Sequence, residues 1–191
     1  MKLYGHEASG HAYKVALGLT LAQIPFEYQR VDIGKPCDTR PADFRAASKW
    51  CEVPCLFKDG QSHIQSGAIL MMLSREYNVL GGVAKLNQAA EWINWEANRI
   101  GMCIPQLLGE LNDGAREWLM TRYEIDKGRL DASLEDRKFL LGNDVSIADI
   151  AVYGYVSKTE KAGLNLTKNI LNWRDNIGSL PHFQTADDLL A

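Results

Sequence analysis

The fold is decided by residues 53–66, which read Val-Pro-Cys-Leu-Phe-Lys-Asp-Gly-Gln-Ser-His-Ile-Gln-Ser. The Asp-Gly pair at 59–60 stands between two short apolar segments, which is typical of a tight β-hairpin turn. We therefore expect antiparallel strands over residues 53–57 and 62–64. Ser66 precedes apolar residues at helical spacing, and its hydroxyl can accept a hydrogen bond from a first helical turn. We expect Ser66 to be the N-cap of a helix.

The sequence before this hairpin alternates between strand and helix patterns. Residues 2–5 are apolar and short enough for a buried strand, and the next apolar residues recur at helical spacing up to Gln23, before Pro25. Residues 26–33 carry aromatic and β-branched side chains and predict a second strand, while residues 42–47 predict a short helix. The predicted order is βαβ, a short helix, and then ββα.

The second half of the chain is predicted to be helical. Residues 79–87 contain a Gly-Gly pair and lack a sustained apolar period. We interpret them as a linker between a first domain, residues 1–78, and a second domain, residues 88–191. A long helix is expected over residues 89–111, with a bend at Pro105.

One further helix start is marked by the sequence Val-Ser-Ile-Ala-Asp-Ile at residues 145–150. Ser146 can accept a hydrogen bond from the Asp149 amide, while the Asp149 side chain can accept one from the Ser146 amide. This arrangement is a capping box, and an ordinary capped helix accounts for it on physical grounds alone.

Composition excludes several classes of function. The chain has 191 residues, of which 46% are hydrophobic and 24% charged, with a formal net charge of −3. Because it has no basic run, we expect no nucleic-acid partner. The N-terminal residues lead directly into strand-like sequence, without a signal-peptide pattern or an apolar segment long enough to span a membrane. We therefore expect a cytoplasmic protein with no membrane partner.

The four cysteines are Cys37, Cys51, Cys55 and Cys103. None belongs to a Cys-x-x-Cys motif, and no histidine is spaced to complete a zinc site, so we expect no metal. We predict reduced, free thiols, as is usual for cytosolic proteins. Two of these residues flank Pro54 and stay candidates for a place near a site.

These features together resemble the cytosolic glutathione transferases, and in particular their bacterial serine-type members. The resemblance rests on the order of elements, Val53-Pro54, Gln65-Ser66 and the capping box, and it covers nearly the whole chain. It implies a thioredoxin-like α/β domain followed by an all-α domain, with a cis proline. It also implies that glutathione is bound by the backbone of Val53 and, at its γ-glutamyl end, by Gln65 and Ser66.

The resemblance is less complete at the glycine end of glutathione and at the expected dimer contact. Lys35 matches a lysine that meets the glycine carboxylate of glutathione, although an exposed turn lysine is an equal alternative. Asn94 matches an asparagine that reaches glutathione across a dimer, although a helical asparagine is more often solvated or bonded locally. Glu52 departs from the family pattern, because its carboxylate stands where it would repel the glycine end. Lys49 or Lys35 are candidates to compensate.

The sulfur of glutathione is expected to meet Ser9. The stretch Ser9-Gly10-His11 resembles the serine-type pattern, with His11 as a secondary candidate and Tyr4 as the competing one. Lowering a thiol pKa of ~8.5 by ~2 units requires about 2.7 kcal/mol. A hydroxyl at a helix N-terminus can supply this through one hydrogen bond and the helix dipole. The structural alternatives are a plain N-cap for Ser9, a core tyrosine and a surface histidine.

The resemblance implies a homodimeric glutathione transferase that joins the glutathione thiolate to small electrophiles, as in detoxification. Trp95 and Met102 are candidates for the electrophile pocket. The alternatives are a non-catalytic glutathione-binding protein of the same fold, for which Glu52 is the best argument, and a glutathione-dependent peroxidase. Glutathione-dependent disulfide reduction is disfavoured, because that chemistry calls for a cysteine where Ser9 stands.

Overall fold

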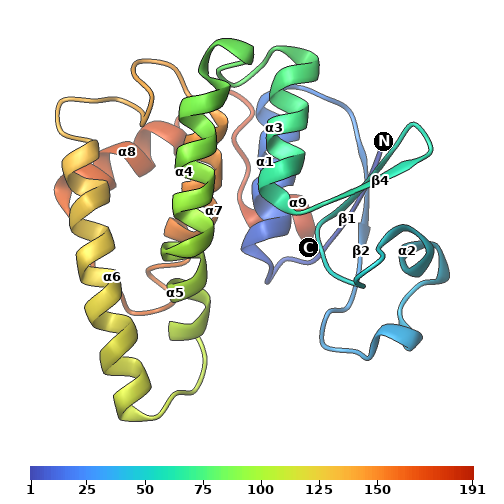
Figure 1. Ribbon diagram of the computed structural model, residues 1–191, viewed down its shortest axis with the longest axis horizontal. Coiled ribbons are helices and arrows are strands. Elements are labelled where there is room, and N and C mark those ends of the chain that lie inside the picture. The colour runs from blue at the N-terminus through green and yellow to red at the C-terminus, as the bar shows by residue number, and fades with distance from the viewer.

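The computed structural model describes residues 1–191 and contains one four-stranded sheet beside a group of helices (Figure 1). The strand order is β2-β1-β3-β4. Strand β1 (Lys2–Gly5) pairs parallel with β2 (Glu27–Arg30) and antiparallel with β3 (Cys55–Lys58). Strand β4 (Gln61–Ile64) continues the sheet as the predicted hairpin partner of β3.

Helices cover both faces of this sheet. Helices α1 (Gly10–Leu21) and α3 (Ser66–Tyr77) pack side by side on one face (Figure 1). The short helix α2 (Ala42–Ala47) packs against β3 on the other face, after the 3-10 turn η1 (Cys37–Thr39). This half has the predicted thioredoxin-like architecture.

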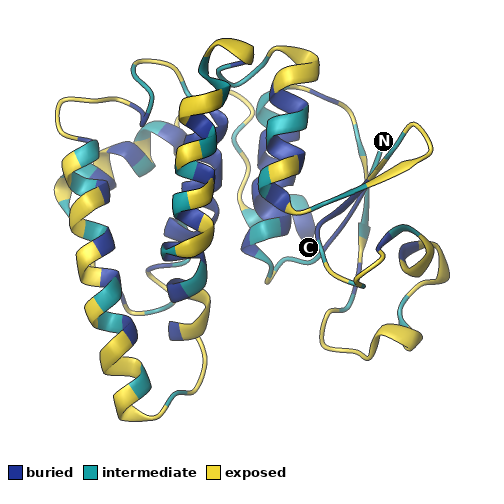
Figure 2. Ribbon diagram, viewed as in Figure 1, coloured by how far each residue is buried: buried dark blue, intermediate teal, exposed yellow.

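The rest of the chain is all helical, as predicted. Its elements are η2 (Val83–Lys85), α4 (Leu86–Asn98), α5 (Ile100–Leu107), α6 (Asp113–Ser133), α7 (Ile147–Val156), α8 (Lys168–Gly178) and α9 (Ala186–Leu190). Helix α7 is buried along its whole length and packs against α1 and α4 (Figure 2). Helix α9 returns to pack against α1. One apolar core of 37 buried residues therefore joins the two halves. No helix combines the length and the apolar character needed to cross a membrane.

The predicted capping box forms at the start of α7. The Asp149 Oδ2 atom accepts hydrogen bonds from the Ser146 backbone N–H at 2.9 Å and from the Ser146 hydroxyl at 2.7 Å. The other carboxylate oxygen accepts from the Leu140 N–H and from the Trp173 indole N–H. Asp149 thus ties α7 to the preceding loop and to α8.

The prediction of one helix over residues 89–111 was wrong. The chain breaks at Arg99, where φ is −124° and ψ is −101°, and Pro105 lies within α5. The break precedes Gly101, at which no Cβ could fit because the Glu96 carboxylate and carbonyl oxygen already lie there. The buried Glu96 side chain therefore takes space that the next helical turn would need.

Two further differences concern helix starts. Ser66 is the first residue of α3 and not its N-cap, which is Gln65, with a positive φ of 68°. In the expected linker, η2 and the start of α4 already form before residue 88, because the chain turns at Gly81 and Gly82 with positive φ values of 96° and 53°.

The prediction of four free thiols was also wrong. Cys37 and Cys51 form a disulfide, with 6.0 Å between their Cα atoms. The chain between them folds through α2 and returns, which brings together two residues that are 14 positions apart. Cys55 and Cys103 are free and buried.

Candidate functional site

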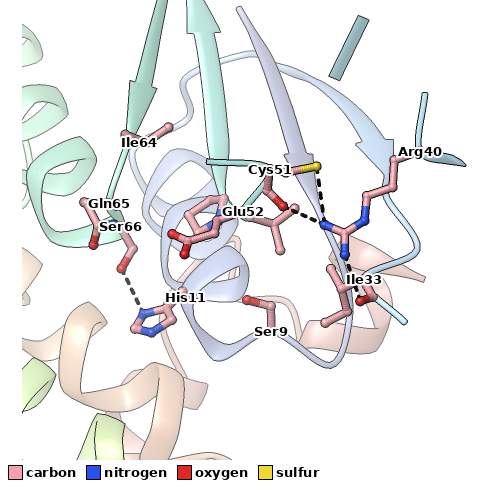
Figure 3. Close-up of a pocket in the computed structure, with 11 residues that line it drawn as sticks. Ser9, His11, Ile33, Arg40, Cys51, Glu52, Ile64, Gln65 and Ser66 are labelled. Carbon is pink, nitrogen blue, oxygen red and sulfur yellow. Dashed lines mark hydrogen bonds between the residues drawn. The ribbon is translucent and has the colours of Figure 1, made fainter. Parts of the chain in front are cut away.

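A cavity of about 420 Å³ opens where the starts of α1 and α3 meet the segment before β3 (Figure 3). Its lining consists of Ser9, His11, Ile33, Arg40, Cys51, Glu52, Val53, Pro54, Ile64, Gln65 and Ser66. The structure thus brings together five of the seven site residues predicted from the sequence. The other two, Lys35 and Asn94, do not line this cavity.

Ser9 lies at the head of α1. Its side-chain oxygen accepts a hydrogen bond from the Ala12 N–H at 3.1 Å, so it is the N-cap of this helix. A serine hydroxyl keeps its own proton after accepting such a bond, and that proton is available to a group in the cavity. The positive end of the α1 dipole points to the same place. Ser9 can therefore stabilise an anion beside it.

His11 lies two residues after Ser9, in the first turn of α1, and contacts α3. Its Nδ1 atom is 3.1 Å from the Ser66 hydroxyl oxygen, and its ring packs edge-on against Tyr155 with 5.2 Å between ring centroids. Burial, and then the positive charge of Lys14, lower the pKa of His11 to about 4. The ring is therefore neutral near pH 7, and it holds Ser66 at the start of α3.

The Val53–Pro54 peptide bond is cis, and Val53 precedes the first residue of β3. Neither its N–H nor its C=O has a hydrogen-bond partner within the chain. An extended peptide can pair with such a free backbone edge. Ser66 and Gln65 stand close by at the N-terminus of α3, where a helix favours a negative charge (Figure 3).

Arg40 is the charged cavity residue that sequence reasoning missed. Its guanidinium donates to the carbonyl oxygens of Ile33, Lys35 and Cys51, at 3.0, 2.8 and 2.6 Å in turn, which fixes the cation in the cavity wall. Glu52 is exposed and lines the same cavity (Figure 3). A lone arginine in a polar loop gives no sequence signal, since only the folded loop shows which carbonyl groups surround it.

Comparisons with known proteins concern the first domain and the overall fold. Residues 8–76 match the family model for the N-terminal domain of glutathione S-transferases. A solved glutathione S-transferase from Pseudomonas fluorescens superposes with a TM-score of 0.84 at 28% identity, covering 97% of this chain and 98% of that one. The first domain of this chain therefore belongs to the glutathione S-transferase N-terminal domain family. The fold of the chain, a thioredoxin-like domain followed by an all-α domain, is that of a glutathione transferase.

Two curated proteins are similar to this chain. The disulfide-bond oxidoreductase YfcG of Escherichia coli is 27% identical over 189 residues, which cover 90% of this chain and 87% of YfcG. A maleylpyruvate isomerase of a Ralstonia species is 36% identical over 77 residues, which cover 40% of this chain and 36% of that protein. These two relatives are named for different activities.

The two predicted residues outside the cavity are bonded locally. The Lys35 ammonium is 3.5 Å from the Asp32 carboxylate, and its side chain is exposed. Asn94 is exposed on α4 and donates to the Ala90 carbonyl oxygen at 2.8 Å. Lys49, the other candidate to compensate Glu52, lies over the Trp50 ring. No group of three or more potential metal ligands is present.

Proposed function

We propose that this family member is an active glutathione S-transferase, in which Ser9 stabilises the thiolate of bound glutathione for attack on a small electrophile. One observation carries the proposal: the Ser9 hydroxyl at the head of α1 shares a cavity with the unpaired backbone of Val53. In the reaction the sulfur forms a bond to the electrophilic carbon, and the leaving group departs with its bonding electrons. The chain's part is to bind, orient and ionise the thiol.

The binding residues follow from the shape of the peptide. The cysteinyl backbone of glutathione pairs with the N–H and C=O of Val53, and its γ-glutamyl carboxylate lies at the start of α3 against Gln65 and Ser66. His11 acts through Ser66 as a positioning residue, because its neutral ring is within hydrogen-bond distance of that hydroxyl. This arrangement fits a short, extended peptide thiol.

The glycine end meets opposite charges in the cavity wall. Arg40 attracts the glycine carboxylate and is held in place by three carbonyl groups, whereas Glu52 repels it. Arg40 thus takes the part that Lys35 was expected to play. Lys35 stays a second candidate, because it lies in the same loop and its carbonyl oxygen accepts from Arg40.

The assembly and location remain proposals as well. We propose two domains, residues 1–78 and 88–191, joined by residues 79–87, and a homodimer with a twofold axis, as is common for family members of this architecture. In that dimer Asn94 would face the partner's cavity. A cytoplasmic location is consistent with glutathione as the substrate.

The test compares Ser9→Ala with Ser9→Thr, which keeps both the hydroxyl and the helix cap. The ultraviolet absorbance of the bound thiolate, followed against pH, gives the thiol pKa in each variant. We expect the pKa to rise by roughly 1–2 units in Ser9→Ala, which is the equivalent of one charged hydrogen bond, and to change little in Ser9→Thr. Conjugation of a generic aromatic chloride should fall in parallel. Tight glutathione binding without turnover of any chloride or peroxide supports the non-catalytic alternative.

A second candidate function is glutathione-dependent disulfide reduction. It is favoured by the name of the relative YfcG, which is 27% identical over most of both chains. In this case the Ser9-stabilised thiolate attacks a sulfur of a disulfide substrate in place of a carbon. Reduction of a small disulfide by glutathione, lost in Ser9→Ala, would support this candidate over conjugation alone.

A further inference from the structure

The Cys37–Cys51 disulfide borders the proposed glutathione cavity through one of its two cysteines. Cys51 is half-buried and lines the cavity, and Cys37 is exposed in η1. Stable structural disulfides are generally resistant to reduction, whereas exposed disulfides are the labile ones that take part in exchange. Cys37 is thus the more exposed residue of the pair, and we take its sulfur as the one that a thiolate attacks.

Arg40 distinguishes the two sulfurs further. Its Nη1 atom donates to the Cys51 carbonyl oxygen at 2.6 Å and lies 3.9 Å from the Cys51 sulfur. A guanidinium at this distance stabilises a thiolate, and a more stable thiolate is a better leaving group in disulfide exchange. The two cysteines therefore suit different roles in exchange. Cys37, the more exposed residue, is the one attacked, and Cys51, beside Arg40, is the leaving group.

The other two cysteines offer no such site. Cys55 and Cys103 are free and fully buried, and burial raises the pKa of both thiols, that of Cys55 to about 11. A buried, protonated thiol is inert in exchange. Thiol–disulfide exchange is therefore expected at the Cys37–Cys51 pair and not at these two cysteines.

We propose that the Cys37–Cys51 pair is a thiol–disulfide exchange site, which glutathione reduces and which in turn reduces a second, small disulfide. A glutathione thiolate attacks the Cys37 sulfur, forms a glutathione–Cys37 disulfide and releases the Cys51 thiolate beside Arg40. A second glutathione thiolate attacks the glutathione sulfur of this mixed disulfide. Oxidised glutathione leaves, and the bonding electrons return to Cys37 as a thiolate.

The reduced pair then reacts with the substrate disulfide. The Cys37 thiolate attacks one substrate sulfur, forms a mixed disulfide and releases the first substrate thiolate, which takes up a proton. The Cys51 thiolate attacks the Cys37 sulfur, releases the second substrate thiolate and restores the Cys37–Cys51 bond. Two glutathione molecules and one disulfide thus give oxidised glutathione and two thiols.

This activity goes beyond transfer to electrophiles and rests on the proposed function only for the identity of the reducing thiol. The test is the glutathione-dependent reduction of bis(2-hydroxyethyl) disulfide, with release of oxidised glutathione followed by a coupled reductase. We expect losses of at least tenfold in Cys37→Ser and in Cys51→Ser. Cys103→Ser is the matched control and should keep the wild-type rate, since a serine there can also donate to the Leu119 carbonyl oxygen.

The trapped intermediate provides a second readout. In Cys51→Ser no resolving thiol is left, so incubation with oxidised glutathione should place one glutathione on Cys37, as seen by mass spectrometry of the peptide. In the wild-type protein the same treatment after reduction should restore the internal disulfide. Absence of the adduct at Cys37 overturns the proposal.

Ser9→Ala separates this inference from the proposed function. If Cys37→Ser keeps full disulfide reduction and Ser9→Ala loses it, the reaction takes place at the Ser9-held thiolate and the exchange site is overturned. If Ser9→Ala keeps both disulfide reduction and conjugation, the exchange site stands and the proposed role of Ser9 fails. Conjugation of the aromatic chloride in Cys37→Ser should stay near wild type, which controls for folding.

The role of Arg40 is tested with Arg40→Met against Arg75→Met, a change at an exposed arginine on α3. Reduction by 2-mercaptoethanol is measured, so that weaker binding of glutathione does not contribute. We expect Arg40→Met to slow reduction roughly tenfold, because the Cys51 thiolate leaves less readily. In a Cys37→Ser background, the pH dependence of Cys51 alkylation should shift upward with Arg40→Met. Unchanged rates and an unchanged alkylation profile would exclude the assigned role.

Discussion

The Lys14 ammonium lies 2.6 Å from the Glu96 Oε2 atom, and both side chains are only 1% exposed. This ion pair joins α1 to α4, and Lys14 lies about one helical turn along α1 from His11. The Lys14 ammonium also lies 5.3 Å from the centre of the Tyr155 ring, against which His11 packs. A buried charge therefore stands in the same cluster of side chains that fixes the wall of the site.

Removing one partner of this pair should destabilise the protein strongly. Glu96→Ala leaves the Lys14 ammonium buried without a counter-charge, so we expect the free energy of unfolding to fall by about 3–5 kcal/mol. Urea denaturation followed by tryptophan fluorescence measures the change. The double variant Lys14→Met with Glu96→Leu removes both charges and should lie much closer to wild type. A loss below about 1 kcal/mol in Glu96→Ala would contradict a dry, paired site.

The depressed pKa of His11 predicts a loss of stability in acid. In the unfolded chain the imidazole titrates near its ordinary value of 6.5, whereas in the folded protein its pKa is about 4. Between these values the unfolded state binds the extra proton, so stability is complete above pH 6.5 and falls as the pH drops toward 4. We expect this one group to contribute about 2 kcal/mol to the decline, after allowance for its partial exposure.

The variant His11→Asn isolates this contribution. Asparagine does not titrate and can still bond the Ser66 hydroxyl, so the free energy of unfolding of wild type minus that of the variant should decrease as the pH falls from 7 to 4. Measuring the urea midpoint at several pH values gives that difference, in which the other titrating groups cancel. Parallel stability curves for the two proteins would show that His11 titrates normally.

The charges proposed to face the glycine end of glutathione predict how its affinity changes when each charge is removed. Glu52→Gln removes a carboxylate that repels the glycine carboxylate, so we expect glutathione to bind roughly three- to tenfold more tightly, the equivalent of about 1 kcal/mol. Calorimetry at low ionic strength is the appropriate measurement, because salt screens exposed charges. Arg40→Met should change affinity in the opposite direction.

A glutathione derivative amidated at glycine is the control for both variants. It carries no negative charge at that end, so Glu52→Gln should leave its affinity unchanged. If Glu52→Gln has the same effect on glutathione and on the amide, Glu52 does not face the glycine end and the orientation proposed for the tripeptide is wrong.

Local patterns in the sequence predicted the elements that local physics determines. The Asp59-Gly60 turn has positive φ values of 50° and 76°, as a tight hairpin turn needs, and it joins β3 to β4 where the sequence indicates. The capping box at Ser146 likewise depends on residues three positions apart. In both cases the interacting groups are neighbours in the chain, so their spacing is visible in the sequence.

The features of the site and core that sequence reasoning missed depend on contacts formed only in the folded chain. The break at Arg99 depends on the burial of Glu96, which in turn depends on Lys14, 82 positions earlier in the chain. The Cys37–Cys51 disulfide has no motif, and Arg40 reaches the cavity because of the carbonyl groups of a folded loop. The sequence held one signal of the buried ion pair: Lys14 is a charged residue within an apolar helical pattern.

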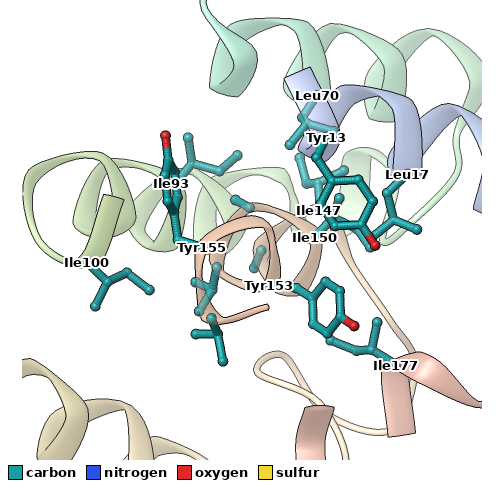
Figure 4. Close-up of a cluster of buried hydrophobic side chains, with 14 of the residues drawn as sticks. Tyr13, Leu17, Leu70, Ile93, Ile100, Ile147, Ile150, Tyr153, Tyr155 and Ile177 are labelled. Carbon is teal, nitrogen blue, oxygen red and sulfur yellow. The ribbon is translucent and has the colours of Figure 1, made fainter. Parts of the chain in front are cut away.

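Asp149 should be among the residues least tolerant of substitution in the helical half. It is fully buried in α7, whose apolar residues Ile147, Ile150 and Tyr153 pack in the core shared with α1 (Figure 4). Its carboxylate accepts four hydrogen bonds, from two groups of Ser146, from the Leu140 N–H and from the Trp173 indole. Removing the carboxylate leaves four buried donors without an acceptor.

We therefore expect Asp149→Ala to lower the free energy of unfolding by about 4 kcal/mol or more, since each unsatisfied buried donor costs about 1–3 kcal/mol. Asp149→Asn keeps the volume and one oxygen but turns an N–H₂ group toward the Ser146 N–H, so its loss should be intermediate. Ser146→Ala removes only the hydroxyl and should cost about 1 kcal/mol. Chemical denaturation of the three variants, with Ser179→Ala at an exposed helix end as control, tests this order. Equal losses in Asp149→Ala and Ser146→Ala would mean that the bonds to Leu140 and Trp173 contribute nothing, and that Asp149 acts as a helix cap alone.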